Sequence, residues 1–252
     1  MSQESRGIAL VTGASSGIGA ATARALASEG FHVIAAARRM DRLEALAATN
    51  SNIEAHALDV TSQASVNALA KYLTGKPLSL VVSNAGGAFD AAPVLTSDPA
   101  IWDKTYQVNV IGSLRVIQAL TPIMQAHGKG HIVLLTSTAG HGAYENGGSY
   151  TTAKSAEVVL AQTLRLELNG LNIRITEVAP GMVKTEEFSP VRFGGDTERA
   201  EKVYAGVDAP LTADDVAETI RWATTLPSHV NVDSLIVRPV AQASNYKIHR
   251  KQ

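Results

Sequence analysis

The sequence predicts a three-layer, doubly wound α/β fold, with a seven-stranded parallel sheet between two layers of helices. Two observations lead to this prediction. Short apolar runs rich in β-branched residues alternate with longer helical patterns along almost the whole chain. These runs are nearly continuous in their apolar character, as expected of parallel strands that are buried on both faces. A length of 252 residues fits one such domain over 1–252, and we find no internal repeat or linker.

The expected elements follow one another in a regular order. Strands are expected over 8–12, 32–37, 53–60, 78–84, 131–136, 173–178 and 232–237, where the apolar runs lie. Helices are expected over about 17–29, which is rich in alanine, over 99–125 and over 150–169. A further helix should begin at about Arg42, with Asp41 as its N-cap. The stretch 181–210 is too long for an ordinary connection and is therefore a candidate substrate-binding lid.

Composition excludes several classes of protein. The chain is 45% hydrophobic and 18% charged, as in soluble globular proteins, and its net charge of -1 gives no attraction to nucleic acid or acidic membranes. The absence of cysteine excludes disulfides, thiolate zinc sites and cysteine nucleophiles. The seven histidines have no zinc-ligand spacing, and we expect no metal. The polar N-terminus lacks the apolar core of a signal peptide, and no apolar run is long enough to cross a membrane. A cytoplasmic enzyme or binding protein for a small molecule is expected.

A glycine-rich loop follows the first strand and predicts a dinucleotide site. The loop residues expected to bind the cofactor are Gly13, Ser15, Ser16, Gly17, Ile18 and Gly19. The glycines allow a tight turn and a close approach to a pyrophosphate, which would lie at the N-terminus of the next helix. The spacing is G-x-x-x-G-x-G, which is related to the G-x-G-x-x-G pattern.

The end of the second strand indicates which dinucleotide is bound. Sites for NAD place an acidic residue about 20 residues after the glycines, to bind the ribose 2′-hydroxyl. Here the strand ends in small apolar residues followed by Arg38 and Arg39. Two guanidinium groups suit a 2′-phosphate, so we expect NADP(H). The alternative is that both arginines are solvated charges at a strand end.

Two further strand ends should face the same ligand, because open sheets bind ligands at the carboxyl ends of their strands. Asp59 and Val60 end the third strand, where a carboxylate can accept a hydrogen bond from the adenine amino group. Asn84, Ala85 and Gly86 end the fourth strand and place small residues near the ribose.

Tyr150 and Lys154 are the strongest indication of chemistry. A spacing of four residues on a helix places the phenol and the ammonium on one face, where the cation stabilises a phenolate. Ser137 lies thirteen residues upstream and could hold a carbonyl oxygen against the phenol. This set is suited to moving a proton on or off an alcohol oxygen. Taken alone, the Tyr-x-x-x-Lys pair could equally be an ordinary surface pair.

Together these residues resemble the short-chain dehydrogenase/reductase family, in its single-domain branch. The motifs that match, in the family's order, are Thr12–Gly19, Asp59, Asn84-Ala85-Gly86, Asn109, Ser137, Tyr150 with Lys154, and Pro180-Gly181 with Thr185. One departure is Ser83, where many members have asparagine.

The resemblance implies a Rossmann fold and a role for each matching residue. Tyr150 would be the acid/base, Lys154 would bind the nicotinamide ribose, and Ser137 would orient the carbonyl. Asn109 would hold a water molecule that links Lys154 to solvent. Pro180, Gly181, the Val183 backbone and the Thr185 hydroxyl would bind the carboxamide and phosphates. The resemblance also implies a homotetramer or homodimer, formed by the helices at 99–125 and 150–169.

The C-terminal third is similar to the NADP-dependent 3-hydroxy acid dehydrogenases, at 188–196, 200–202 and 226–232. That similarity implies serine, allo-threonine or 3-hydroxypropionate as the type of substrate. Arg192, in the candidate lid, would then bind the substrate carboxylate, unless it is an ordinary surface arginine. We expect His141, Tyr144 and Asn146 to line the pocket, and we expect His127 and His131 to be solvated, because they flank a Gly-Lys-Gly turn.

Three other functions are considered. A reductase of bulkier hydrophobic carbonyls would use the same catalytic residues. Only the sequences of 181–210 and of the C-terminal tail, 245–252, argue against it. A non-catalytic NADP-binding regulator would have no use for an activated phenol. A sugar-nucleotide epimerase shares the Tyr-x-x-x-Lys pair, but it needs a separate substrate domain for which 252 residues leave no room.

Overall fold

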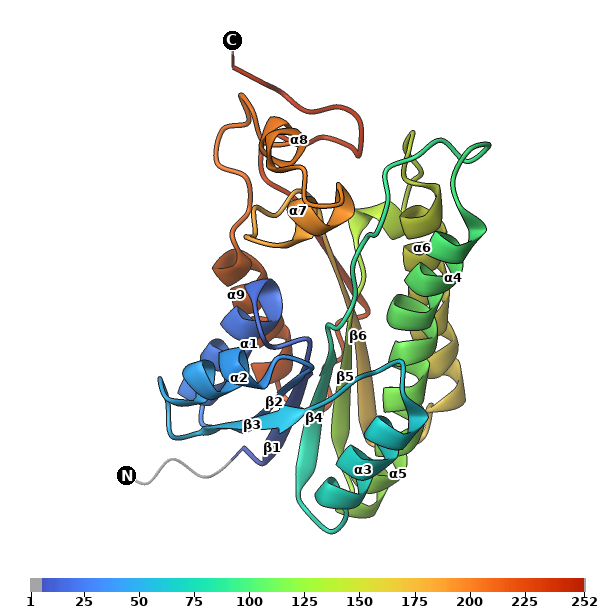
Figure 1. The fold of residues 1–252 in the computed structure, drawn as a ribbon. Coiled ribbons are helices and arrows are strands. Elements are labelled where there is room, and N and C mark those ends of the chain that lie inside the picture. The colour runs from blue at the N-terminus through green and yellow to red at the C-terminus, as the bar shows by residue number, and fades with distance from the viewer. Residues whose placement is uncertain (1–5, 252) are drawn as a thin grey trace.

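Seven parallel strands form one sheet in the computed structural model, which describes residues 6–251. The strand order is β3-β2-β1-β4-β5-β6-β7 (Figure 1). The strands are β1 (Ile8–Thr12), β2 (His32–Ala37), β3 (Ile53–Ala57), β4 (Leu78–Ser83), β5 (Gly130–Leu135), β6 (Ile173–Pro180) and β7 (Ser234–Val237). The helices are α1 (Gly17–Ser28), α2 (Met40–Ala47), α3 (Gln63–Leu73), α4 (Pro99–Tyr106), α5 (Gly112–His127), α6 (Gly148–Glu167), α7 (Phe188–Arg192), α8 (Thr197–Lys202) and α9 (Ala213–Thr225). The predicted doubly wound α/β fold is confirmed.

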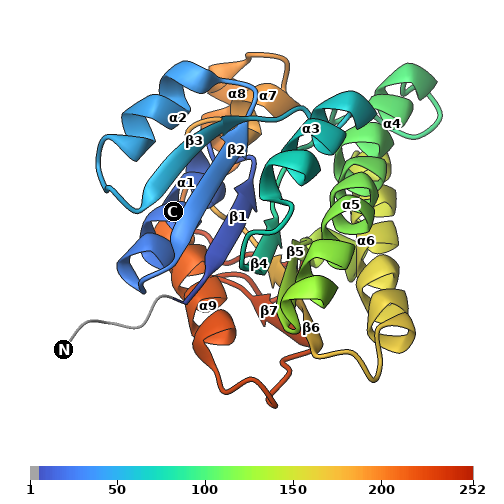
Figure 2. The ribbon, with the colours of Figure 1, turned by 90° about the horizontal axis from the view of Figure 1, so that it is seen from below.

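Helices cover both faces of the sheet and bury one apolar cluster on each face. Helices α1, α2 and α9 lie on one face, and α3, α5 and α6 lie on the other (Figure 2). Successive residues of β1 alternate between the two clusters, with Ala9 and Val11 on one side and Ile8 and Leu10 on the other. All five residues of β1 are buried, which explains why the strand reads as a continuous apolar run.

The strand order reverses between β1 and β4, and this reversal positions the site. The chain leaves β1 for α1 on one face, whereas it leaves β4 for α4 and α5 on the other face. The two connections diverge, so a crevice forms between them at the carboxyl ends of the strands.

Several boundaries differ from the predicted ones. Strand β3 ends at Ala57 rather than Val60, and β7 begins only at Ser234. Helix α2 begins at Met40 with Arg39 in the N-cap position, so Asp41 lies in the first turn and the prediction that it caps the helix is wrong. An acidic side chain there still interacts favourably with the helix dipole.

The helix predicted over 99–125 is interrupted by a π-helical turn at Gln107–Ile111, between α4 and α5. In this turn the Gly112 N–H binds the Gln107 carbonyl, five residues earlier. The Asn109 side chain donates to the Thr105 carbonyl, which a regular helix would give to the Asn109 N–H. The wider turn therefore leaves the Thr105 carbonyl free to accept a hydrogen bond from the buried side chain of Asn109.

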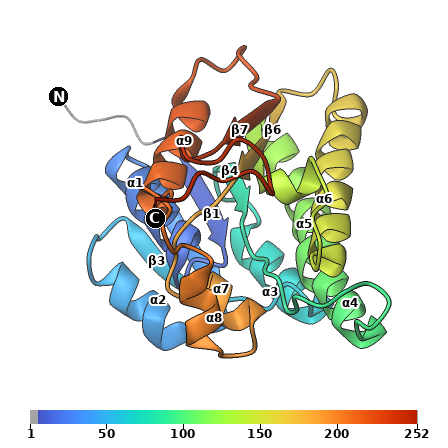
Figure 3. The same cartoon turned by 90° about the horizontal axis from the view of Figure 1, so that it is seen from above.

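The candidate lid at 181–210 contains α7 and α8 and stands above the carboxyl ends of the strands (Figure 3). Its base is closed by a bridge between Val183 and Leu211. The tail folds back onto it, because the Lys251 N–H donates to the Gly206 carbonyl at 2.7 Å. The Asn245 amide also reaches the Thr138 carbonyl, at 2.9 Å. The tail thus packs against the lid of its own chain. Within 6–251, no helix is both long enough and apolar enough to span a bilayer.

Candidate active site

A cleft of about 1080 Å³ opens at the carboxyl ends of the strands, beneath the lid. Nearly all the residues predicted for the site line it. They are Gly13, Ser15, Ser16, Gly17, Ile18, Gly19, Arg38, Arg39, Asp59, Val60, Asn84, Ala85, Gly86, Ser137, Tyr144, Asn146, Tyr150, Lys154, Pro180, Gly181, Val183, Thr185 and Arg192. Asn109 lies behind the wall, and His141 does not line the cleft. Residues far apart in the chain therefore meet around one space.

The glycine-rich loop presents the N-terminus of α1 to the cleft. Gly13 and Gly17 have φ angles of 67° and 52°, which favour glycine, and a Cβ on Gly19 would collide with the Gly13 carbonyl. Ser16 stands in the N-cap position without capping α1, and the first turn carries no acidic residue. Free N–H groups and the positive end of the helix dipole are suited to an anionic group.

The two arginines after β2 have different surroundings. Arg39 forms a two-point ion pair with Glu187 of the lid, from Nη1 to Oε1 at 2.5 Å and from Nη2 to Oε2 at 2.7 Å. Arg42 joins the same carboxylate, and Ser16 donates to it at 2.7 Å. The hydrogen bond from Arg39, with help from Ser16 and Arg42, lowers the pKa of Glu187 to about 2. Across 6–251, no hydrogen bond or ion pair engages the exposed side chain of Arg38.

Two of the residues predicted to bind the cofactor also form hydrogen bonds within the protein. Asp59 accepts hydrogen bonds from the Thr61 hydroxyl and N–H, and these bonds lower its pKa. The Asn84 amide donates to the carbonyls of Thr12 and Gly13, and therefore ties β4 to the glycine-rich loop. Both residues border the cleft, but Asn84 also shapes the loop.

Ser137, Tyr150 and Lys154 come together where β5 meets α6. Ser137 lies just beyond β5, and its hydroxyl accepts the Ala139 N–H at 3.1 Å. A short 3-10 turn, Thr138–Gly140, then packs on α6 so closely that a Cβ on Gly140 would lie 2.7 Å from the Lys154 carbonyl oxygen. The Lys154 ammonium lies 5.8 Å from the centre of the Tyr150 ring. The predicted hydroxyl, phenol and ammonium thus border one part of the cleft.

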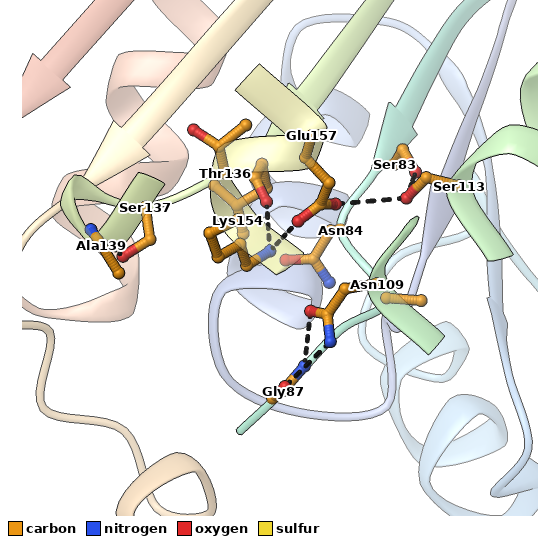
Figure 4. Close-up of polar contacts among 12 residues, drawn as sticks. Ser83, Asn84, Gly87, Asn109, Ser113, Thr136, Ser137, Ala139, Lys154 and Glu157 are labelled. Atoms are coloured by element: carbon orange, nitrogen blue, oxygen red, sulfur yellow. Dashed lines mark hydrogen bonds and ion pairs between the residues drawn. The ribbon is translucent and has the colours of Figure 1, made fainter. Parts of the chain in front are cut away.

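Lys154 has a buried partner that the sequence reasoning missed. Its ammonium lies 2.8 Å from Oε2 of Glu157 and donates to the Leu135 carbonyl at 2.9 Å (Figure 4). The other oxygen of Glu157 accepts from Ser113, which in turn accepts from Ser83, the residue that departs from the family pattern. The signal was present, because residues three apart share a helix face and Glu157 follows Lys154 by three.

Asn109 is fully buried in the π-helical turn and fixes the loop after β4. Its amide donates to the Gly87 carbonyl at 2.9 Å, and its oxygen accepts the Gly87 N–H at 3.1 Å (Figure 4). With the bond to Thr105, Asn109 joins two backbone segments across the base of the cleft. It thus has a clear structural role.

The lid side of the cleft carries aromatic rings and several guanidinium groups, among them that of Arg192. Phe188 packs against Tyr150 with ring centres 5.6 Å apart. Arg192 lies over Tyr144, at 5.3 Å from the ring centre, and its weak bonds reach the carbonyls of Asp90 and Asn146 at 3.4 Å. Its charge has no carboxylate partner among the residues that the structure describes.

Two predictions about histidines are wrong. His131 is buried in β5, where its Nε2 lies 2.8 Å from the Thr176 hydroxyl, and burial with nearby Arg174 lowers its pKa to about 3. The glycines beside it suggested a turn, but β5 begins at Gly130. His141 points away from the cleft to Glu177, at 2.6 Å. In the described range, no three histidine, aspartate or glutamate side chains are placed to hold a metal ion.

Comparisons with known proteins agree with this architecture. The family model described as short chain dehydrogenase matches residues 7–193. The chain is 38% identical to serine 3-dehydrogenase of Agrobacterium fabrum over 249 residues, which cover 97% of this chain and 99% of that protein. It is 35% identical to the NADP-dependent 3-hydroxy acid dehydrogenase YdfG of Escherichia coli, over 97% of this chain and 100% of that protein.

A solved structure of similar fold is the closed form of serine dehydrogenase complexed with NADP+. It matches with a TM-score of 0.91 and 35% identity, covering 97% of this chain and 100% of that chain. An uncharacterised oxidoreductase of Mycobacterium tuberculosis is 51% identical over 237 residues, which cover 94% of this chain and 92% of that protein. The matching family model, the fold and these relatives show that the chain belongs to the short-chain dehydrogenase family and is an oxidoreductase that acts on alcohol groups.

Proposed function

We propose that the protein is an NADP(H)-dependent oxidoreductase that interconverts an alcohol and a carbonyl on a small 3-hydroxy acid. Serine, allo-threonine and 3-hydroxypropionate represent the type of substrate. The main support is that one cleft is lined by the arginines after β2, by the hydroxyl, phenol and ammonium of the catalytic residues, and by Arg192 of the lid.

The residues present fit NADP(H). The uncapped N-terminus of α1 suits the pyrophosphate, and Arg38 and Arg39 suit the 2′-phosphate. The named relatives support the same cofactor, since one is called NADP-dependent and a similar structure contains NADP+. Pro180, Gly181, Val183 and Thr185 also line the cleft and would bind the carboxamide and phosphates. When bound, NADP(H) supplies or accepts the hydride.

Each catalytic residue has a role that matches its surroundings. Tyr150 donates its phenolic proton to the carbonyl oxygen during reduction and accepts it back during oxidation. Ser137 donates a hydrogen bond to the same oxygen and stabilises the charge that develops on it. Lys154 binds the nicotinamide ribose, and its positive charge stabilises the Tyr150 phenolate. Asn109 keeps the loop at Gly87 in place and would hold the water through which Lys154 exchanges protons with solvent.

The proposed chemistry is tested by Tyr150→Phe. Removing the phenolic hydroxyl should lower kcat by about 10²–10⁴-fold, the usual contribution of a general acid or base. NADPH binding, measured by fluorescence, should stay near that of the unaltered protein. A variant with normal turnover would refute the catalytic scheme.

The proposed substrate rests on Arg192, whose guanidinium is free to bind a carboxylate. We expect Arg192→Ala to raise KM for 3-hydroxy acids at least tenfold, because a charged hydrogen bond contributes about 1.5–3 kcal/mol. KM for an uncharged secondary alcohol should change little. If both values of KM stay the same, Arg192 does not bind the substrate.

A second candidate is a reductase of bulkier hydrophobic carbonyls, which the aromatic wall of Tyr144, Phe188 and Phe193 favours. An NADP+-reduction screen over 3-hydroxy acids, plain secondary alcohols and steroid-like alcohols separates the two. Turnover of none of them, together with tight NADPH binding, would instead support a non-catalytic regulator.

A homotetramer is the proposed assembly. Helix α6 exposes Val159 and Leu166, and the segment at and after β7 exposes Ile236 and Val240, which gives two separate apolar faces. Two faces of this kind suit an assembly with more than one two-fold axis. Light scattering with size-exclusion chromatography should give four times the chain mass of 26.4 kDa.

A further inference from the structure

The partner of Lys154 is a carboxylate that water hardly reaches. The side chains of Lys154 and Glu157 are only 4% and 1% exposed. Oε2 of Glu157 has the Lys154 ammonium as its one ionic partner among the described residues, and Oε1 accepts a 3.3 Å bond from Ser113. Figure 4 shows Glu157 on the side of Lys154 that faces away from Ser137. A buried pair of this kind is costly unless each charge stabilises the other.

The balance of charge around Lys154 depends on this carboxylate. Burial acts to lower the pKa of Lys154, but the charge of Glu157, with that of Tyr150, outweighs burial and leaves this pKa above its usual value. Burial in turn raises the pKa of Glu157, because Lys154 and Ser113 only partly offset the loss of water.

The other charged groups near the pair come from β6 and the turn after β5. Glu177 is a second carboxylate near the pair, and its negative charge acts to raise the pKa of Glu157. It is held by the Thr136 hydroxyl, the Ser234 hydroxyl and His141, and it has no ion pair with Lys154. On the remaining side, the Leu135 carbonyl is neutral. Glu157 is therefore the one carboxylate in direct contact with the ammonium among the residues that the structure describes.

We propose that Glu157 is a positioning residue of the catalytic centre, whose carboxylate holds the Lys154 ammonium in place and keeps it charged inside the protein. Two of the three N–H donors of Lys154 then point at Glu157 and Leu135, and the third is left for the cleft. The inference rests on the proposed catalytic role of Lys154. A merely structural Glu157 would affect folding without changing the pH at which Lys154 loses its proton.

The test is Glu157→Gln, which keeps the shape of the side chain and removes its charge. We expect the alkaline limb of the pH profile of kcat/KM to move to lower pH by about one unit or more, since an opposite charge this close shifts a pKa by about 1–3 units. The shift is to lower pH because burial, no longer offset by the charge of Glu157, favours the neutral amine of Lys154. A second readout needs no substrate. In a ¹³C NMR titration of labelled lysines, the signal of Lys154 is identified by its loss in Lys154→Met. The pH midpoint of that signal should fall by the same amount as the kinetic limb.

Two controls accompany this variant. Glu167→Gln makes the same change on the exposed end of α6, ten residues away, and should move neither readout. Glu157→Asp keeps the charge, so the pKa of Lys154 should return most of the way to its value in the unaltered protein. An unchanged Lys154 titration in Glu157→Gln would overturn the proposal even if the enzyme works as proposed. A shifted Lys154 titration with an unmoved pH profile of kcat/KM would instead count against the proposed catalytic role of Lys154 and leave the pairing intact.

A folding failure would also be informative. If Glu157→Gln does not fold, the double variant Lys154→Met with Glu157→Gln decides the matter. Removing both charges should restore folding if each one supports the other, because no lone buried charge remains. A double variant that stays unfolded would refute the pairing.

Discussion

Arg39 and Glu187, which are 148 residues apart in the chain, form an ion pair between the cofactor end of the cleft and the lid. Other donors of Arg39 are occupied as well, because Nε and Nη2 reach the hydroxyls of Ser15 and Ser16. A 2′-phosphate would need the same donors. The lid carboxylate and the phosphate of NADP(H) therefore compete for one guanidinium.

Glu187→Gln tests this competition. Without the charge of Glu187, NADPH should bind more tightly by up to about fivefold, since a partly exposed ion pair contributes about 1 kcal/mol or less. NADH lacks the phosphate and should bind as before. Fluorescence titration with each cofactor measures both values. Glu186→Gln is the matched control, because within 6–251 the ion pair of Glu186 is with Arg42 alone and its side chain is 65% exposed. Equal tightening of NADPH and NADH would contradict the competition.

Arg38→Ala should have the opposite effect. The unengaged guanidinium of Arg38 is available to a 2′-phosphate without giving up another contact. Its loss should weaken NADPH binding by about 10- to 100-fold, as for a charge-assisted hydrogen bond, and leave NADH binding nearly unchanged. The ratio of the two dissociation constants is the quantity to measure. A ratio that does not move would show that Arg38 is a solvated charge.

Asn109→Ala should destabilise the protein. The substitution leaves the half-buried N–H and carbonyl of Gly87 and the buried carbonyl of Thr105 without their partner. The cost should be about 2–4 kcal/mol, read from urea denaturation. Asn67→Ala, on the exposed face of α3, should stay within about 0.5 kcal/mol of the unaltered protein. A similar small effect at Asn109 would mean that the loop does not depend on it.

His131 should make the protein less stable in mild acid. The folded pKa of about 3 lies below the ordinary value of 6.5, so between these values the unfolded chain binds the extra proton. The free energy of unfolding should therefore fall as pH decreases through this window, by about 1.4 kcal/mol per pH unit well below pH 6.5. His131→Gln should show a shallower fall in urea denaturation between pH 7 and pH 4. Parallel curves for the two proteins would refute the assignment.

The elements in their order along the chain and the residues of the cleft could be predicted because their signals are local. A strand such as β1 is almost entirely apolar, and the turn after it requires glycine. Parallel strands place their carboxyl ends along one edge, so Asp59 and Asn84 were expected near the glycine-rich loop before any contact was known.

The unpredicted features depend on tertiary contacts. The π-helical turn exists because Asn109 finds Gly87 from another segment, and helical periodicity carries no trace of that contact. The role of Glu187 was overlooked because no residue near it in the chain indicates an ion pair with Arg39. The burial of His131 was missed because its flanking glycines suggest a turn, whereas the strand that contains it is covered on both faces.

The tail that folds over the lid has a consequence for the order of folding. The bond from Asn245 to Thr138 closes a span of 107 residues, and the turn after α8 is bonded by Arg250 and Lys251 of the tail. Contacts between distant residues cost more loop-closure entropy, and few apolar groups support these ones. We therefore expect the rim of the cleft to form a separate, weaker cooperative unit that orders after the sheet and opens before it. Hydrogen exchange at the rim then reports how often the site opens, whereas exchange in β1 and β4 reports global unfolding.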